Sequence, residues 1–209
     1  MDGPIADEFT EAAAWLAELA AQIPDAAWEQ PGLGVWDIRS LLGHAARALA
    51  TVEDYLSRPA AQIDVPSAVA YLAAAASASP EAIAARGVAA GDALGEDPAT
   101  SVAELAARAT SLVVASPADA LLATIAGGMS LEAYLPTRTV ELVVHGCDLA
   151  QALGLPDQPP DAASAAASRL LVEVQLATTE RSRLCLVLAG RPLVERDLTI
   201  WSGSTSSRD

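Results

Sequence analysis

Hydrophobic residues recur at helical spacing near the N-terminus. One stripe is formed by Phe9, Ala13, Leu16, Ala20 and Ile23. Pro24 follows it, so the pattern predicts a helix over residues 7–23. A second stripe is formed by Ile38, Leu42, Ala45, Leu49, Val52 and Leu56. Asp37 is a candidate N-cap, which predicts a second helix from there to about Ser57.

The middle of the sequence is rich in alanine, and its helices are marked mainly by their ends. Predicted helices cover residues 67–77, 79–94 and 98–115, and Pro117 is a candidate start for a further short helix. Pro80 follows the candidate cap Ser79 and would be the first residue of its helix. Proline is tolerated there because the first amides of a helix have no hydrogen-bond partner within the helix. Two adjacent glycines at 127–128 then interrupt the helical pattern.

Two long helices are predicted in the remainder of the chain. The first begins after Ser130 and ends near Gly154, and Pro136 either kinks it or marks a late start. The second covers residues 161–189, followed by a tail from residue 202 that is expected to be disordered.

Alternating apolar residues between positions 172 and 188 leave one or two strands as an alternative to the last helix. Residues 183–201 are therefore undecided between helix and strand. No internal repeat or interdomain linker interrupts the pattern. The sequence predicts an all-α fold in a single domain over residues 1–209.

Composition supports a helical fold and limits the kinds of partner that the protein is expected to bind. Hydrophobic residues make up 52% of the 209 residues and aromatic residues only 4%, which is typical of a core rich in alanine and leucine. The net charge of −15 repels phosphate groups, and the basic residues, all arginines, form no cluster. Nucleic acid and membrane surfaces are therefore not expected as partners. No apolar run reaches the roughly 18 residues of a membrane span and no signal pattern opens the sequence, so the protein is expected to be soluble and cytoplasmic.

A track of polar residues interrupts the apolar face of the helix predicted after Ser130. Spacing places one inward row at Leu131, Leu135, Arg138, Leu142, His145 and Leu149. Glu141 and Asp148 flank this row, and charged groups on an apolar face are costly to bury unless they are paired or bound to a metal. One explanation is that Arg138 pairs with Glu141 in an internal salt bridge. His145 and Asp148, also three residues apart, would then form a second pair.

The other explanation is a metal site. Glu141 and His145 are four residues apart and share a helix face, and His44, the only other histidine, borders the core on the second predicted helix. Two imidazoles and one carboxylate leave a coordination position open, as in catalytic zinc sites. That position accepts water, a substrate oxygen or a thiolate. The spacing therefore favours a metal centre formed by His44, Glu141 and His145.

Two stretches that contain these residues resemble a known family. Residues 35–44, with the sequence Val-Trp-Asp-Ile-Arg-Ser-Leu-Leu-Gly-His, are similar to the tryptophan-to-histidine stretch of the DinB-like superfamily. Residues 138–154 resemble its second signature, in which arginine, glutamate, histidine and Asp-Leu follow at fixed spacing. Glutamate as the second ligand is similar to the mycothiol-dependent maleylpyruvate isomerase branch. Residues 186–193 also resemble the closing segment of short members.

The resemblance implies an up-down-down-up four-helix bundle with additional helices, in which His44, Glu141 and His145 bind zinc. Nickel, iron or manganese are alternative metals. The resemblance also implies an enzyme that uses a low-molecular-weight thiol, such as mycothiol, to isomerise a small electrophilic metabolite or to transfer sulfur to it. Arg138 is a candidate for binding a substrate carboxylate, and Tyr55 is a candidate for lining the substrate site.

Other aspects of the function stay open. Asp148 is expected to support His145 without binding the metal itself, and no residue is assigned a catalytic role. The resemblance implies a further C-terminal domain in full-length isomerases. Because this sequence ends at Asp209, maleylpyruvate itself is not expected as the substrate. Two alternatives remain, namely a thiol-independent tailoring isomerase, cyclase or hydrolase on the same scaffold, and a non-catalytic metal-binding module.

Overall fold

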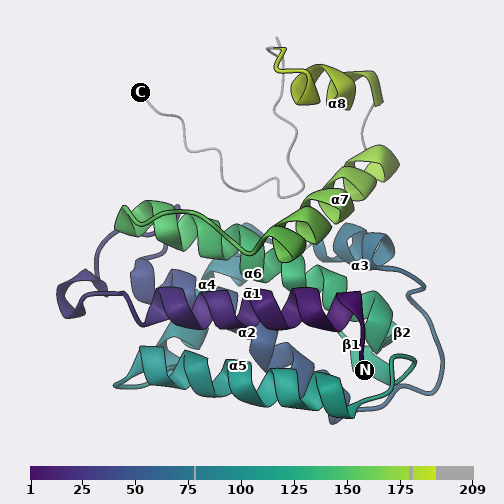
Figure 1. Ribbon diagram of the computed structural model, residues 1–209, viewed down its shortest axis with the longest axis horizontal. Helices are drawn as coiled ribbons and strands as arrows, with labels where there is room; N and C mark the ends of the chain where they lie inside the picture. The colour runs from purple at the N-terminus through teal and green to yellow at the C-terminus, as the bar shows by residue number, and fades with distance from the viewer. Residues whose placement is uncertain (78, 179–180, 192–209) are drawn as a thin grey trace.

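The computed structural model describes residues 1–77, 79–178 and 181–191, and within them the chain is predominantly helical (Figure 1). The central bundle consists of α1 (Pro4–Ala20), α2 (Ile38–Leu56), α5 (Pro98–Ala115) and α6 (Leu131–Leu153). Helix α1 packs on α5 and α6, and α2 packs on the same two helices. The all-α fold with a DinB-like four-helix bundle is thereby confirmed.

Further helices lie outside the bundle. They are α3 (Ala68–Ala75), α4 (Pro80–Ala93), α7 (Asp161–Thr178) and α8 (Arg181–Leu188), and a short 3₁₀ turn, η1, spans Asp25–Ala27. Helix α4 packs on α2, α7 packs on α6, and α3 contacts both α6 and α7. The first helix begins three residues earlier than predicted, and the predicted cap of α2 is confirmed, because the Asp37 carboxylate accepts a hydrogen bond of 2.7 Å from the Ser40 amide.

Helices α2 and α4 approach so closely that their backbones touch at glycines. A Cβ atom on Gly43 would lie 2.2 Å from the backbone nitrogen of Gly91, and one on Gly91 would lie 2.8 Å from the backbone of α2. One turn earlier on α4, Gly87 leaves room for the indole of Trp36, since a Cβ there would lie 2.5 Å from the ring. These three glycines therefore fix α4 against the N-terminal half of α2.

The short helix predicted from Pro117 is wrong, because the chain forms a β-hairpin shortly after that residue. Its strands are β1 (Leu121–Thr124) and β2 (Gly127–Ser130). They pair antiparallel with Leu122 opposite Met129, and both of these side chains are fully buried. Gly128 lets β2 lie against the loop between α2 and α3, since a Cβ there would lie 2.0 Å from the carbonyl oxygen of Gln62. The strands are too short for an alternating pattern to reveal them.

The C-terminal part of the described chain is helical. The alternating apolar residues at 172–176 belong to α7, and those at 184–188 belong to α8. The strand alternative is therefore wrong within these residues. The structure describes the predicted helix over residues 161–189 as α7 and α8, and residues 179–180 lie outside the described part of the chain. The rest of the undecided segment, from residue 192, and the predicted tail lie outside the described residues. The single-domain assignment stays a prediction.

In the described part of the chain, no single helix has the length and apolar character needed to cross a membrane. Only α3 and α4 taken as a pair meet that requirement, and they are bent by 102° at the break between them.

Replacing Gly43 with alanine should destabilise the protein, because α2 and α4 must separate to admit the methyl group. The clash is with backbone, which cannot rotate away, so we expect a loss of about 2 kcal/mol in the free energy of unfolding, measured by chemical denaturation. Ala89→Ser, at an exposed position of α4, is the control and should change stability by less than about 0.5 kcal/mol. An unchanged denaturation midpoint for Gly43→Ala would contradict the close contact.

Candidate metal centre

His44 of α2 meets Glu141 and His145 of α6 between the two helices. The Nε2 atom of His44 lies 3.8 Å from Oε2 of Glu141, and the Nε2 atom of His145 lies 3.3 Å from the same oxygen. The three side chains can each offer one ligand atom such that all three atoms lie within 4.8 Å of one another. The rings of the two histidines meet edge to face at 83°, with centroids 4.6 Å apart. The structure thus brings together the three residues predicted from the sequence.

The antiparallel arrangement of α2 and α6 produces this meeting. Further along α2, the hydroxyl of Tyr134 on α6 donates a hydrogen bond of 2.9 Å to the Thr51 hydroxyl. Residue numbers therefore increase along α2 from His44 to Thr51 in the direction in which they decrease along α6 from Glu141 to Tyr134. The inward row predicted for α6 is confirmed, because its leucines are fully buried at Leu131, Leu135, Leu142 and Leu149.

The donor set fits a divalent metal in identity and in spacing. Imidazole nitrogen and carboxylate oxygen are usual zinc ligands, and four ligands placed about 2.1 Å from an ion at tetrahedral angles lie roughly 3.4 Å from one another. The contacts of 3.3 and 3.8 Å are close to that value. The exposed fractions of the side chains are 16% for His44, 17% for Glu141 and 12% for His145. An ion held here would therefore be shielded and still reachable from solvent.

The three side chains shift one another's pKa values in the metal-free protein. Burial, together with the charge of His145, lowers the pKa of His44 to about 4. Burial alone would raise the pKa of Glu141, but its hydrogen bond to His145 and the charge of that ring hold the pKa well below its usual range. Burial would also lower the pKa of His145, yet hydrogen bonds to Asp148 and Glu141 outweigh burial and raise it. An ionised Glu141 therefore faces a charged His145 and a neutral His44 at neutral pH.

The two histidines are supported in different ways. Nδ1 of His145 lies 3.0 Å from the Oδ2 atom of Asp148, and the role of Asp148 in supporting a metal ligand stays a prediction. Nδ1 of His44 is buried and has no hydrogen-bond partner among the described residues. Instead, the indole of Trp36 stacks on the His44 ring with centroids 4.5 Å apart and planes 29° apart. Trp36 belongs to the family motif at residues 35–44, and its stacking on His44 was not predicted from the sequence.

Arg138 does not form the salt bridge that an internal network would need. The ion pairs of Glu141 are with the two histidines, and the Arg138 side chain turns towards aromatic rings instead. Its guanidinium carbon lies 4.8 Å from the ring centroid of Tyr134 and 5.3 Å from that of Tyr71. Of the two pairs in that explanation, only the one between His145 and Asp148 is observed.

The rings around Arg138 form a tyrosine cluster, made up of Tyr55, Tyr71 and Tyr134. The ring centroids of Tyr55 and Tyr71 lie 5.4 and 5.5 Å from that of Tyr134. Burial raises the pKa of Tyr55 and of Tyr134, so both hydroxyls stay protonated at neutral pH. Tyr55 is thus a member of this cluster and Arg138 lies against it, and both residues were predicted to contact substrate. Tyr71 was missed because its alanine-rich helix α3 shows little amphipathic pattern.

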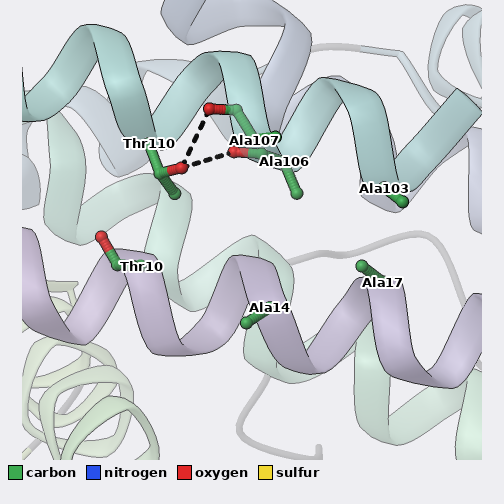
Figure 2. Close-up of a pocket in the computed structure, with 7 residues that line it drawn as sticks. All are labelled: Thr10, Ala14, Ala17, Ala103, Ala106, Ala107 and Thr110. Carbon is green, nitrogen blue, oxygen red and sulfur yellow. Dashed lines mark hydrogen bonds between the residues drawn. The ribbon is translucent and has the colours of Figure 1, made fainter.

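A separate groove lies between α1 and α5, which run antiparallel (Figure 2). Its volume is about 300 Å³. Figure 2 shows its lining, formed by Thr10, Ala14, Ala17, Ala103, Ala106, Ala107 and Thr110. These residues offer methyl groups and two hydroxyls, and the Thr110 hydroxyl already donates to the carbonyl of Ala106 at 2.8 Å. The groove therefore carries no group suited to acid–base or metal chemistry, and the candidate site is the triad.

The fold and the site together define the class of protein, namely a helical bundle with a candidate metal centre formed by two imidazoles and one carboxylate. The chain is a member of the family of mycothiol maleylpyruvate isomerase N-terminal domains, whose model matches residues 9–150. The matched part contains His44, Glu141 and His145. No curated protein and no solved structure gives a significant match to the sequence.

Removing one ligand should abolish tight metal binding. We expect near-stoichiometric metal in the wild-type protein, purified without a histidine tag or chelator, and little metal in His44→Ala or Glu141→Gln, measured by elemental analysis. Glu132→Gln, at an exposed position of the same helix α6, is the matched control and should keep its metal. Equal metal contents in all four proteins would exclude the triad as the binding site.

Proposed function

We propose that the protein is a zinc-dependent enzyme that uses mycothiol, or a related low-molecular-weight thiol, to isomerise a small electrophilic metabolite or to transfer sulfur to it. The observation that carries this proposal is the meeting of His44, Glu141 and His145 in a chain of this family. Three protein ligands leave one coordination position for a group from solution. A bound zinc ion supplies Lewis acidity and lowers the pKa of the thiol or water in that position.

The proposed reaction begins with addition of a thiolate to a conjugated double bond. The sulfur bonds to one alkene carbon, the former double bond rotates as a single bond, and elimination restores the double bond and releases the thiolate. If the neighbouring carbon takes up a proton instead, the thioether leaves as the product of sulfur transfer. Both routes need a thiol whose sulfur is deprotonated near neutral pH.

The side chains of this protein would hold and orient the reacting groups. Asp148 would accept the Nδ1 hydrogen of His145 and so leave the Nε2 atom of that ring free to hold a metal ion. Both histidines are ligands in this proposal, and the sequence contains no lysine. Any proton transfer by the protein therefore falls to a carboxylate or a tyrosine.

Arg138 would bind a carboxylate of the substrate. In the metal-free protein the charge of Glu141 acts on this guanidinium, and a metal bound to Glu141 would take up that negative charge. The Arg138 side chain is only 8% exposed, and a buried charge without a counter-charge is costly. A carboxylate offers that counter-charge and matches the planar fork of a guanidinium. Tyr55 would line the same side of the site.

Mycothiol should bind at the metal of a cobalt-loaded protein and produce a sulfur-to-cobalt charge-transfer band in the near ultraviolet. Glu141→Gln should show no band, Glu132→Gln should match the wild type, and S-methylated mycothiol should give no band with either protein. A metal-loaded protein whose spectrum does not respond to the thiol, or which turns over a substrate in thiol-free buffer, would eliminate the thiol requirement.

Substrate selection should depend on Arg138. We expect the wild-type enzyme to prefer an α,β-unsaturated carboxylic acid over its methyl ester by about 10- to 100-fold in kcat/KM, the range for one hydrogen bond to a charged group. In Arg138→Met, which keeps a long side chain without the charge, this preference should disappear. A preference that persists in the variant would place the carboxylate elsewhere.

A further inference from the structure

His44 is held by an aromatic contact where a metal ligand usually has a hydrogen bond. A ligating histidine generally donates its second ring N–H to a carboxylate, a carbonyl or water, which fixes the orientation of the ring. His145 has such a partner in Asp148 at 3.0 Å. Within the described part of the chain, the buried Nδ1 of His44 has none, and one face of its ring is covered by the indole of Trp36 at a centroid distance of 4.5 Å.

Trp36 is itself held in place by α4. Its Nε1 donates a hydrogen bond of 3.0 Å to the carbonyl of Ala84, and Gly87 provides the space for the ring. The backbone of Trp36 is held by a turn, since its amide donates to the carbonyl of Leu33 at 3.0 Å. The indole therefore has a defined position and plane, set by groups outside the triad.

We propose that Trp36 is a positioning residue for the metal centre, which orients the imidazole of His44 by stacking in place of the missing hydrogen bond. The ring of His44 thus stacks on this indole and also meets the His145 ring edge to face, with a centroid distance of 4.6 Å. Rotation of the His44 ring would give up the stacked contact and turn Nε2 away from Glu141. The inference rests on the metal centre of the proposed function and is independent of the thiol and the substrate.

Core packing alone would also bury Trp36, and the two roles differ in what they predict. A packing role predicts that a smaller side chain lowers stability and leaves the bound metal unchanged. A positioning role predicts a change in metal affinity and in coordination geometry, with rescue by another aromatic ring. The visible absorption of bound Co²⁺ reports that geometry without any need for enzymatic activity.

The experiment compares Trp36→Leu, Trp36→Phe and the control Trp28→Leu, which removes a partly buried indole that packs under Arg39 rather than on His44. Zn²⁺ and Co²⁺ affinities are measured by competition with a chromophoric chelator, and thermal stability is measured in parallel. We expect Trp36→Leu to weaken metal binding about tenfold or more and to alter the Co²⁺ spectrum. Trp36→Phe should stay within about threefold of the wild type with its spectrum restored, since the phenyl ring keeps most of the stacking area.

Gly87→Ala provides a second variant in case Trp36→Leu does not fold. Its new methyl group would displace the indole without removing it, and the same loss of affinity and spectral change are expected. Wild-type affinity and spectrum in a folded Trp36→Leu or Gly87→Ala protein would overturn the inference while leaving the metal centre intact. Failure of the wild-type protein to bind metal would overturn both. An equal loss in Trp28→Leu would show a general effect of core packing and would likewise overturn it.

Discussion

The negative charge of Glu141, held inside an apolar bundle, is the constraint on which the rest of the site depends. A buried carboxylate is tolerated only where neighbouring groups compensate it, and here the compensation comes mainly from the hydrogen bond and charge of His145, while a neutral His44 approaches from a different helix. His145 is supplied by the same helix one turn later, which needs only helical geometry. His44 is supplied by α2, and its presence requires that α2 and α6 run antiparallel with a register that sets His44 beside Glu141 and Thr51 beside Tyr134.

That register is maintained from outside the bundle as well as from within. The leucines of α6 fill the interior, while Gly43 of α2 and Gly91 of α4 allow the backbones of these two helices to touch. No side chain can rotate at such a contact, so it transmits position more rigidly than a contact between flexible side chains. Trp36 extends the same support to the imidazole of His44. The packing of small residues on α4 and the geometry of the polar triad are therefore parts of one arrangement.

Most of the helices and the three candidate ligands could be predicted from the sequence, because helical periodicity and the spacing of Glu141 and His145 are local properties. The hairpin at residues 121–130 could not, since its strands are four residues long and owe their pairing to burial of Leu122 and Met129. The partners of Arg138 were also missed. Helical spacing favoured Glu141 as the partner of Arg138. The tyrosines come from α2, α3 and α6, and only tertiary packing decides which of them the guanidinium contacts.

The distribution of the three ligands along the chain links occupancy of the site to folding. Two ligands lie one turn apart on α6 and can approach an ion in any state that contains this helix, whereas the third joins them only when α2 has docked. An ion bound by all three would therefore act as a cross-link between distant segments and would bind the native chain in preference to the unfolded one. Thermodynamic linkage then requires that the population of native molecules rises with the free concentration of that ion.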